Sequence, residues 1–151
     1  MMTIDTSQLG RAKELHAASI LIAHGIYVFQ PLVDSGFDLI ATDKFASNFV
    51  PVQVRFKAKR TGFTIAEHEL KKFRDAKVVL AYCSLAAIPG DGMSTAETTF
   101  WFVPIEEFAA VARQREDSKH VVTWNENRDL TSKWLGKGGL RSAFDSVWPA
   151  D

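Results

Sequence analysis

The chain has little of what marks secreted, disulfide-bonded or membrane-spanning proteins. It has one cysteine in 151 residues, so no internal disulfide can form. Its apolar runs are interrupted within about ten residues, short of the roughly 18 that span a bilayer, and the N-terminus lacks the basic and then apolar pattern of a signal peptide. We therefore expect a soluble, cytoplasmic protein with no membrane partner.

Net charge is also absent, because 18 basic residues balance 18 acidic ones. This balance argues against a protein that coats nucleic acid through its overall charge. The stretch from Gln53 to Lys77 nevertheless contains eight basic residues and three acidic ones. The stretch from Arg128 to Arg141 contains four basic residues and one acidic one. These stretches are either ordinary solvated faces or two basic borders of a groove for a polyanion. In the second case the candidate nucleic-acid contacts are Lys59, Arg60, Lys71 and Lys137.

Several common catalytic patterns are missing as well. The four histidines are scattered without metal-ligand spacing, so we do not expect a zinc site. The sequence has no G-x-S-x-G elbow, and the run from Gly136 to Gly139 lacks the spacing and the following Ser or Thr of a phosphate-binding loop. We interpret that run as a mobile turn. Cys83 lies in an apolar run and is expected to be a small buried side chain.

Hydrophobic periodicity predicts one globular domain over residues 1–151, with strands and helices alternating after an antiparallel start. A chain that is 46% hydrophobic can bury a core of that size. The pattern favours a mixed α/β sheet. Helices are expected at 7–24, 66–75 and 105–115, strands at 26–29, 37–41, 50–57, 77–85, 98–103 and 120–124, and a loop at 88–95.

Two of the expected strands carry polar groups that are out of place. Asp38 interrupts the first apolar strand, and in the second strand apolar residues alternate with Gln53, Arg55 and Lys57, which puts these three on one face. If the strands pair, Asp38 and Gln53 can lie side by side at a sheet surface. A carboxylate within an apolar strand is costly without a partner, so we interpret Asp38 as functional. The structural alternatives are an Asp38–Arg55 ion pair and a cross-strand amide pair for Gln53.

The order of these residues resembles the PD-(D/E)XK nuclease superfamily, whose restriction-endonuclease-like fold is shared by archaeal Holliday junction resolvases. The resemblance covers roughly residues 10–108 and rests on Glu14 in a helix, Asp38 on a strand and Gln53-Val54-Arg55 on the next strand. It implies an α/β restriction-endonuclease-like core, with a mixed central β-sheet flanked by helices. The superfamily pattern has an acid and a Lys at the last two diagnostic positions. Here Gln53 and Arg55 replace them.

The resemblance also implies roles for these residues. A hard cation, Mg²⁺ or Mn²⁺, would take oxygen ligands, which the resemblance assigns to Glu14, Asp38, Gln53 and the Val54 carbonyl. Arg55 would stabilise the charge that develops on the attacked phosphate, and Lys57, on the same face, is a candidate substitute. Asp34, before Ser35 and Gly36, is either a turn former or a further residue within reach of the metal.

The sequence therefore predicts a metal-dependent endonuclease that hydrolyses DNA phosphodiester bonds. One alternative is a catalytically inactive protein of nuclease fold that binds nucleic acid or a protein partner, and another is an unrelated α/β domain. Because nucleases of this superfamily are often dimers, the resemblance also implies a homodimer, although the sequence shows no interface pattern.

Overall fold

The computed structural model describes residues 3, 5–33, 36–57, 62–84, 100–123 and 125–148. The larger of its two sheets has the strand order β1-β2-β3-β5-β6 and consists of β1 (Tyr27–Phe29), β2 (Leu39–Thr42), β3 (Phe49–Lys57), β5 (Val79–Ser84) and β6 (Phe100–Pro104). The smaller sheet has the order β4-β8-β7 and consists of β4 (Gly62–Ala66), β8 (Lys119–Thr123) and β7 (Arg113–Gln114). The helices are α1 (Thr6–Ala23), α2 (Glu67–Ala76), α3 (Ile105–Val111), α4 (Arg128–Lys133) and α5 (Gly136–Val147).

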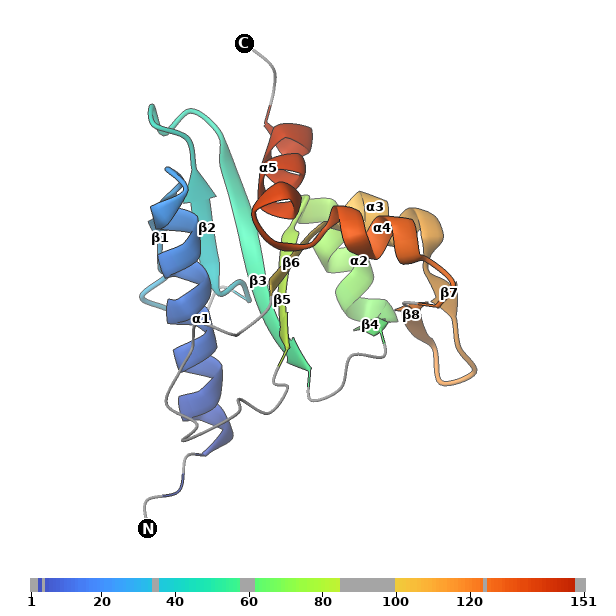
Figure 1. Ribbon diagram of the computed structural model, residues 1–151. Coiled ribbons are helices and arrows are strands. Elements are labelled where there is room, and N and C mark those ends of the chain that lie inside the picture. Colours follow the sequence, from blue (N-terminus) through green and yellow to red (C-terminus); the bar gives the residue numbers. More distant parts are fainter. Residues whose placement is uncertain are drawn as a thin grey trace, which may run out of the picture.

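The larger sheet is mixed, as the sequence predicts. β1, β2 and β3 pair antiparallel, β3 and β5 pair parallel, and β5 and β6 pair antiparallel. The parallel pair requires a crossover, and β4 and α2 lie within it. Figure 1 shows α1 lying along β1 and β2, with α2, α3 and the small sheet gathered at the other end of the molecule.

Two apolar clusters occupy the two faces of the larger sheet. Val52 and Val54 of β3 pack with α1 and α5 on one face, where Ala17 and Leu21 of α1 are fully buried. The other face packs against α2, α3 and the small sheet. Because side chains alternate along a strand, the residues between the buried valines of β3 point to that second face.

Helix α1 begins and ends close to the predicted limits, and its N-cap is Asp5. Asp5 caps the helix by accepting a 2.8 Å hydrogen bond from the Gln8 N–H, and the Gln8 side chain accepts from the Asp5 N–H at 3.0 Å. This reciprocal arrangement satisfies two backbone donors at the helix start. Gly25 follows the helix with a φ of +85°, as expected for a glycine that ends a helix.

Two expectations about local structure are wrong. The helix predicted at 105–115 ends at Val111, because Arg113 and Gln114 pair with β8 instead. The glycine run that starts at Gly136 is the first turn of α5 and not a mobile turn. In each case a tertiary contact decides the conformation over local propensity.

The expectation for Cys83 is confirmed. Cys83 is fully buried on β5, and its burial raises the pKa of the thiol to about 11, as expected of an inert side chain. Trp101 and Phe102 are core residues. The predicted loop at 88–95 lies outside the described residues.

Within the ranges that the structure describes, no helix is both long enough and apolar enough to cross a membrane.

The two adjacent glycines of α5 give a test of this packing. A Cβ at Gly139 would overlap the backbone carbonyl of Trp134, whereas a Cβ at Gly138 would meet nothing within 4 Å. We expect Gly139→Ala to destabilise the protein by about 2 kcal/mol or more, the scale of overpacking a buried site. Gly138→Ala should be neutral or stabilise it by up to about 1 kcal/mol, through helix propensity. Urea denaturation of both variants measures the difference, and equal effects would contradict the packing of α5.

Candidate active site

Asp38 lies at the seam between β2 and β3. It directly precedes β2, where Leu39 pairs with Val52, so the same register places Asp38 beside Gln53. The Val54 N–H donates a 2.8 Å hydrogen bond to Asp38 Oδ2. The carboxylate is therefore fixed on the neighbouring strand by a backbone donor, and the predicted side-by-side placement of Asp38 and Gln53 agrees with the register.

Glu14 of α1 brings a second carboxyl group to Asp38. Burial raises the pKa of Glu14, and the nearby Asp38 charge raises it further. Burial also raises the pKa of Asp38, although the Val54 N–H and the hydrogen bond with Glu14 lower it in part. Arg11 accompanies the pair, with its Nη1 3.2 Å from Glu14 Oε2. Two adjacent carboxyls whose pKa values burial raises, and of which Asp38 further raises that of Glu14, form a concentrated site of negative charge.

Gln53 adds an oxygen that lacks a protein partner. Its Oε1 is buried and, among the described residues, accepts no hydrogen bond, so the cross-strand amide pair is not formed. A buried acceptor without a donor is unfavourable unless a water or an ion satisfies it. The carboxyls of Glu14 and Asp38 are hard donors of the kind that Mg²⁺ and Mn²⁺ prefer, so these two residues fit a divalent cation. This set contains only two acids, in keeping with the absence, over the described ranges, of any cluster of three His, Cys, Asp or Glu residues that could hold a metal.

Arg55 is held by α2 and is not ion-paired with Asp38. Its Nη2 is hydrogen-bonded to Glu69 Oε2, and its guanidinium lies over the Phe73 ring at 5.6 Å from the centroid. Glu69 and Phe73 are four residues apart and therefore share one face of the helix. The sequence reasoning missed Glu69. An acid and an aromatic at this spacing, in the helix that follows the Arg55 strand, is the signal that could have found it.

The remaining predicted residues are distributed more widely. Lys57 ends β3, and its side chain lies outside the described part of the structure, as do Asp34, Lys59 and Arg60. The exposed Lys71 is on α2 and the exposed Lys137 is on α5, and these helices pack against opposite faces of the sheet. The structure thus brings Glu14, Asp38 and the backbone N–H of Val54 together, whereas the Gln53 side chain points to the face of the sheet opposite α1. It does not place Lys71 and Lys137 along one groove.

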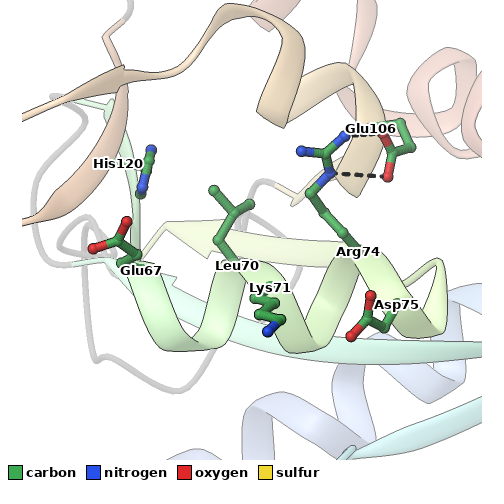
Figure 2. Close-up of a pocket in the computed structure, with 7 residues that line it drawn as sticks. All are labelled: Glu67, Leu70, Lys71, Arg74, Asp75, Glu106 and His120. Carbon is green, nitrogen blue, oxygen red and sulfur yellow. Dashed lines mark hydrogen bonds and ion pairs between the residues drawn. The ribbon is translucent and has the colours of Figure 1, made fainter.

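A surface pocket of about 460 Å³ lies away from this site, between α2, α3 and β8 (Figure 2). Its charges are of both signs and partly neutralise one another, as in the 3.0 Å ion pair between Arg74 and Glu106. Lys71 lines this pocket, whereas Glu69, on another face of α2, contacts Arg55. The pocket therefore lacks the uniform positive charge of a phosphate site.

Comparison with solved structures identifies the fold. The chain is similar to the Holliday junction resolvase Hjc of the archaeon Archaeoglobus fulgidus, with a TM-score of 0.58 and 11% identity over 89% of this chain and 96% of that one. It is also similar to the bacterial homing endonuclease I-Ssp6803I, with a TM-score of 0.55 and 14% identity over 96% of this chain and 95% of that one. The fold is restriction-endonuclease-like. No protein-family model and no curated protein sequence matches the chain.

The carboxyl pair makes stability depend on pH. Both folded-state pKa values are raised, so ionisation costs folding free energy, and stability falls as pH rises from the ordinary carboxyl pKa of about 4 through the raised values. Without metal, Asp38→Asn should therefore melt at a higher temperature than the wild type at pH 7. The gain should disappear below about pH 4, where both carboxyls are protonated in either state.

Thermal melts between pH 4 and pH 8 in EDTA measure this dependence, with the exposed Asp145→Asn as the control that leaves the profile unchanged. A gain that is independent of pH, or a loss at pH 7, would contradict the half-buried carboxyl pair.

Proposed function

We propose that the protein is a metal-dependent endonuclease that hydrolyses DNA phosphodiester bonds. The observation that carries the proposal is the pair of carboxyls, Glu14 and Asp38, with Asp38 fixed by the Val54 N–H at 2.8 Å. The fold is one that a resolvase and a homing endonuclease share. A divalent cation bound there supplies Lewis acidity toward a phosphate oxygen.

The chain's own residues have distinct roles in this proposal. Glu14 and Asp38 hold the cation, and the resemblance adds Gln53 and the carbonyl of Val54. The Asp38 carboxylate keeps its orientation because the Val54 N–H occupies one of its oxygens at 2.8 Å. Arg55 contributes a guanidinium that stays charged at all physiological pH values, so its role is to stabilise phosphate charge and not to exchange a proton.

A second candidate function is an inactive protein of the same fold that binds nucleic acid or a protein partner. The observation that favours it is the ion pair of Arg55 with Glu69, because the Glu69 carboxylate neutralises the guanidinium charge that a scissile phosphate would contact. An amide at Gln53 is also a weaker partner for a divalent cation than a carboxylate. The two functions are separated by whether products form.

Cleavage assays on plasmid, four-way junction and single-stranded DNA, with Mg²⁺, Mn²⁺ or EDTA, test the proposal. We expect cleavage only with metal, and a rate at least about 100-fold lower in Asp38→Ala. Asp145→Ala removes an exposed carboxylate elsewhere and should cleave normally. Cleavage that Asp38→Ala leaves unchanged would refute the site. DNA retention that weakens steeply with salt, without products, would establish the inactive alternative.

Arg55 gives a second test that separates phosphate stabilisation from metal binding. We expect Arg55→Ala to slow cleavage by roughly 100-fold while leaving Mn²⁺ affinity, measured by calorimetry, unchanged. The matched control is Arg113→Ala, which breaks a 3.4 Å ion pair with Glu126 at the surface and should affect neither quantity. Melting curves of both variants show whether they fold. A rate unaffected in a folded Arg55→Ala protein would remove Arg55 from the reaction.

A further inference from the structure

Lys13 is a buried cation to which the proposed reaction assigns no role. It lies on the face of α1 that packs against the larger sheet, one turn before the buried Ala17 and two turns before the buried Leu21, and it is only 9% exposed. Lysine is rarely buried without a partner, because its ammonium loses hydration when it leaves water. An acid is therefore expected beside it.

The effects of the Lys13 charge on its neighbours locate the ammonium near one end of the sheet. Burial raises the pKa of the Cys83 thiol, and the Lys13 charge opposes this rise. Burial lowers the pKa of His16, and the Lys13 charge lowers it further. Cys83 is the last residue but one of β5 and pairs with Phe56, the last residue but one of β3. Figure 1 shows the N-terminal half of α1 and the end of β3 at the same end of the molecule.

The sheet offers no counter-ion to this ammonium. Among the described residues, the side chains that β3, β5 and β6 turn toward α1 are apolar, namely Val52, Val54, Phe56, Val79, Ala81, Cys83, Phe100 and Phe102. Asp5, at the start of α1, is engaged in its capping bond with the Gln8 N–H at 2.8 Å. Within the same part of the chain Lys13 forms no hydrogen bond and no ion pair.

The carboxyl pair is not the missing partner either. Burial raises the pKa of both Glu14 and Asp38, and the positive charges that act against it are those of Arg11 and, at Asp38, also of Arg55. Glu14 forms its ion pair with Arg11, at 3.2 Å. Lys13 and Glu14 are consecutive in the helix and so point about 100° apart around its axis. The ammonium is therefore beside the carboxyl pair and is not neutralised by it.

His16 adds a second polar atom without a partner. It follows Lys13 by three residues on the same face of α1, and its ring meets Phe100 edge-on, with 5.1 Å between the ring centroids. Its Nδ1 is buried and makes no hydrogen bond to any described residue. An imidazole ring is either neutral or positive, so it cannot balance an ammonium. The two side chains leave a positive charge that only an anion can neutralise, and the described part of the chain does not supply one.

We propose that Lys13 binds a phosphate group at this end of α1. A lysine ammonium is a compact charge with three donors, and it binds phosphate oxygens without needing a planar partner. Lysine keeps its ammonium toward water while burying its stem, so an oxygen of a phosphate can reach the part of Lys13 that stays exposed. The phosphate is either a free anion or part of the DNA backbone. The second source rests on the proposed function, which brings DNA to the adjacent Glu14 and Asp38.

Inorganic phosphate, added in EDTA and without DNA, tests the site. At about ten times its dissociation constant, and compared with chloride at matched ionic strength, phosphate should raise the melting temperature of the wild type by about 3–6 °C. Lys13→Met has a side chain of similar length without the charge, and it should abolish this rise. In the chloride buffer Lys13→Met should melt higher than the wild type, because it no longer buries an unpaired charge.

Lys119→Met is the matched control, because Lys119 is an exposed lysine on β8, and it should respond to phosphate as the wild type does. Lys13→Arg keeps the charge and should keep the rise. Circular dichroism confirms folding, and Lys13→Gln replaces Lys13→Met if that variant does not fold. A rise that Lys13→Met shares with the other proteins would be the general stabilisation by an excluded salt and would overturn the proposal. A wild type that phosphate does not stabilise would overturn it too.

Duplex DNA binding in EDTA identifies the source of the phosphate. Each DNA phosphate that a lysine neutralises contributes about 0.9 to the slope of log K against log salt concentration. We expect Lys13→Met to bind roughly tenfold more weakly and to reduce the slope by about one, and Lys119→Met to change neither. If Lys13→Met loses the response to inorganic phosphate but keeps the slope, the site is supported and its ligand is the free anion.

These measurements need no metal and no cleavage, so they separate the phosphate site from the proposed function. The expected responses of Lys13→Met in a protein that never cuts DNA would refute the nuclease alone. Metal-dependent cleavage by a protein that phosphate stabilises no better than chloride would refute the Lys13 site alone.

Discussion

The hydrogen bond from the Val54 N–H to the Asp38 carboxylate ties the candidate site to the strand pairing that organises the whole sheet. β3 is bonded to β2 on one side and to β5 on the other, and its alternation buries Val52 under α1 while turning Gln53 to the opposite face. A slip of one residue would reverse both faces. The register that forms the apolar core is therefore the register that assembles the site, and neither can change without the other.

Much of the fold can be predicted from the periodicity of apolar residues. α1, β3 and β5 are long and periodic, and the burial of their apolar residues favours a helix or a strand whichever element they pack against. The elements that the sequence did not predict are short or depend on a distant partner. β7 has two residues and exists only because β8 lies beside it. The glycines that open α5 suggest a loop by propensity, yet Gly139 is buried against the Trp134 carbonyl, where a side chain has no room.

The candidate site likewise has a part that strand patterns predict and a part that depends on packing between elements. The neighbouring placement of Asp38 and Gln53 needs only the alternation of two paired strands, and it could be predicted. The partner of Arg55 was missed, because the spacing of Glu69 and Phe73 points to Arg55 only once the rotation of α2 about its axis is known, which the burial of Leu70 and Phe73 sets. The mutual effect of Glu14 and Asp38 likewise requires the packing of α1 across the sheet. Contacts between elements are fixed by three-dimensional packing, which periodicity does not encode.

Gln53 and Arg55 can be understood together as a displacement of charge. Asp38 already raises the pKa of Glu14, so a third carboxylate at position 53 would add like-charge repulsion to a partly buried site. The Gln53 amide offers an oxygen without that repulsion, although it attracts a cation less strongly. Glu69 supplies negative charge from α2 instead, and it lies against Arg55 and not against the carboxyl pair. The positive charge at Arg55 is thereby balanced locally, and in the proposed site the affinity for a cation would rest on Glu14 and Asp38.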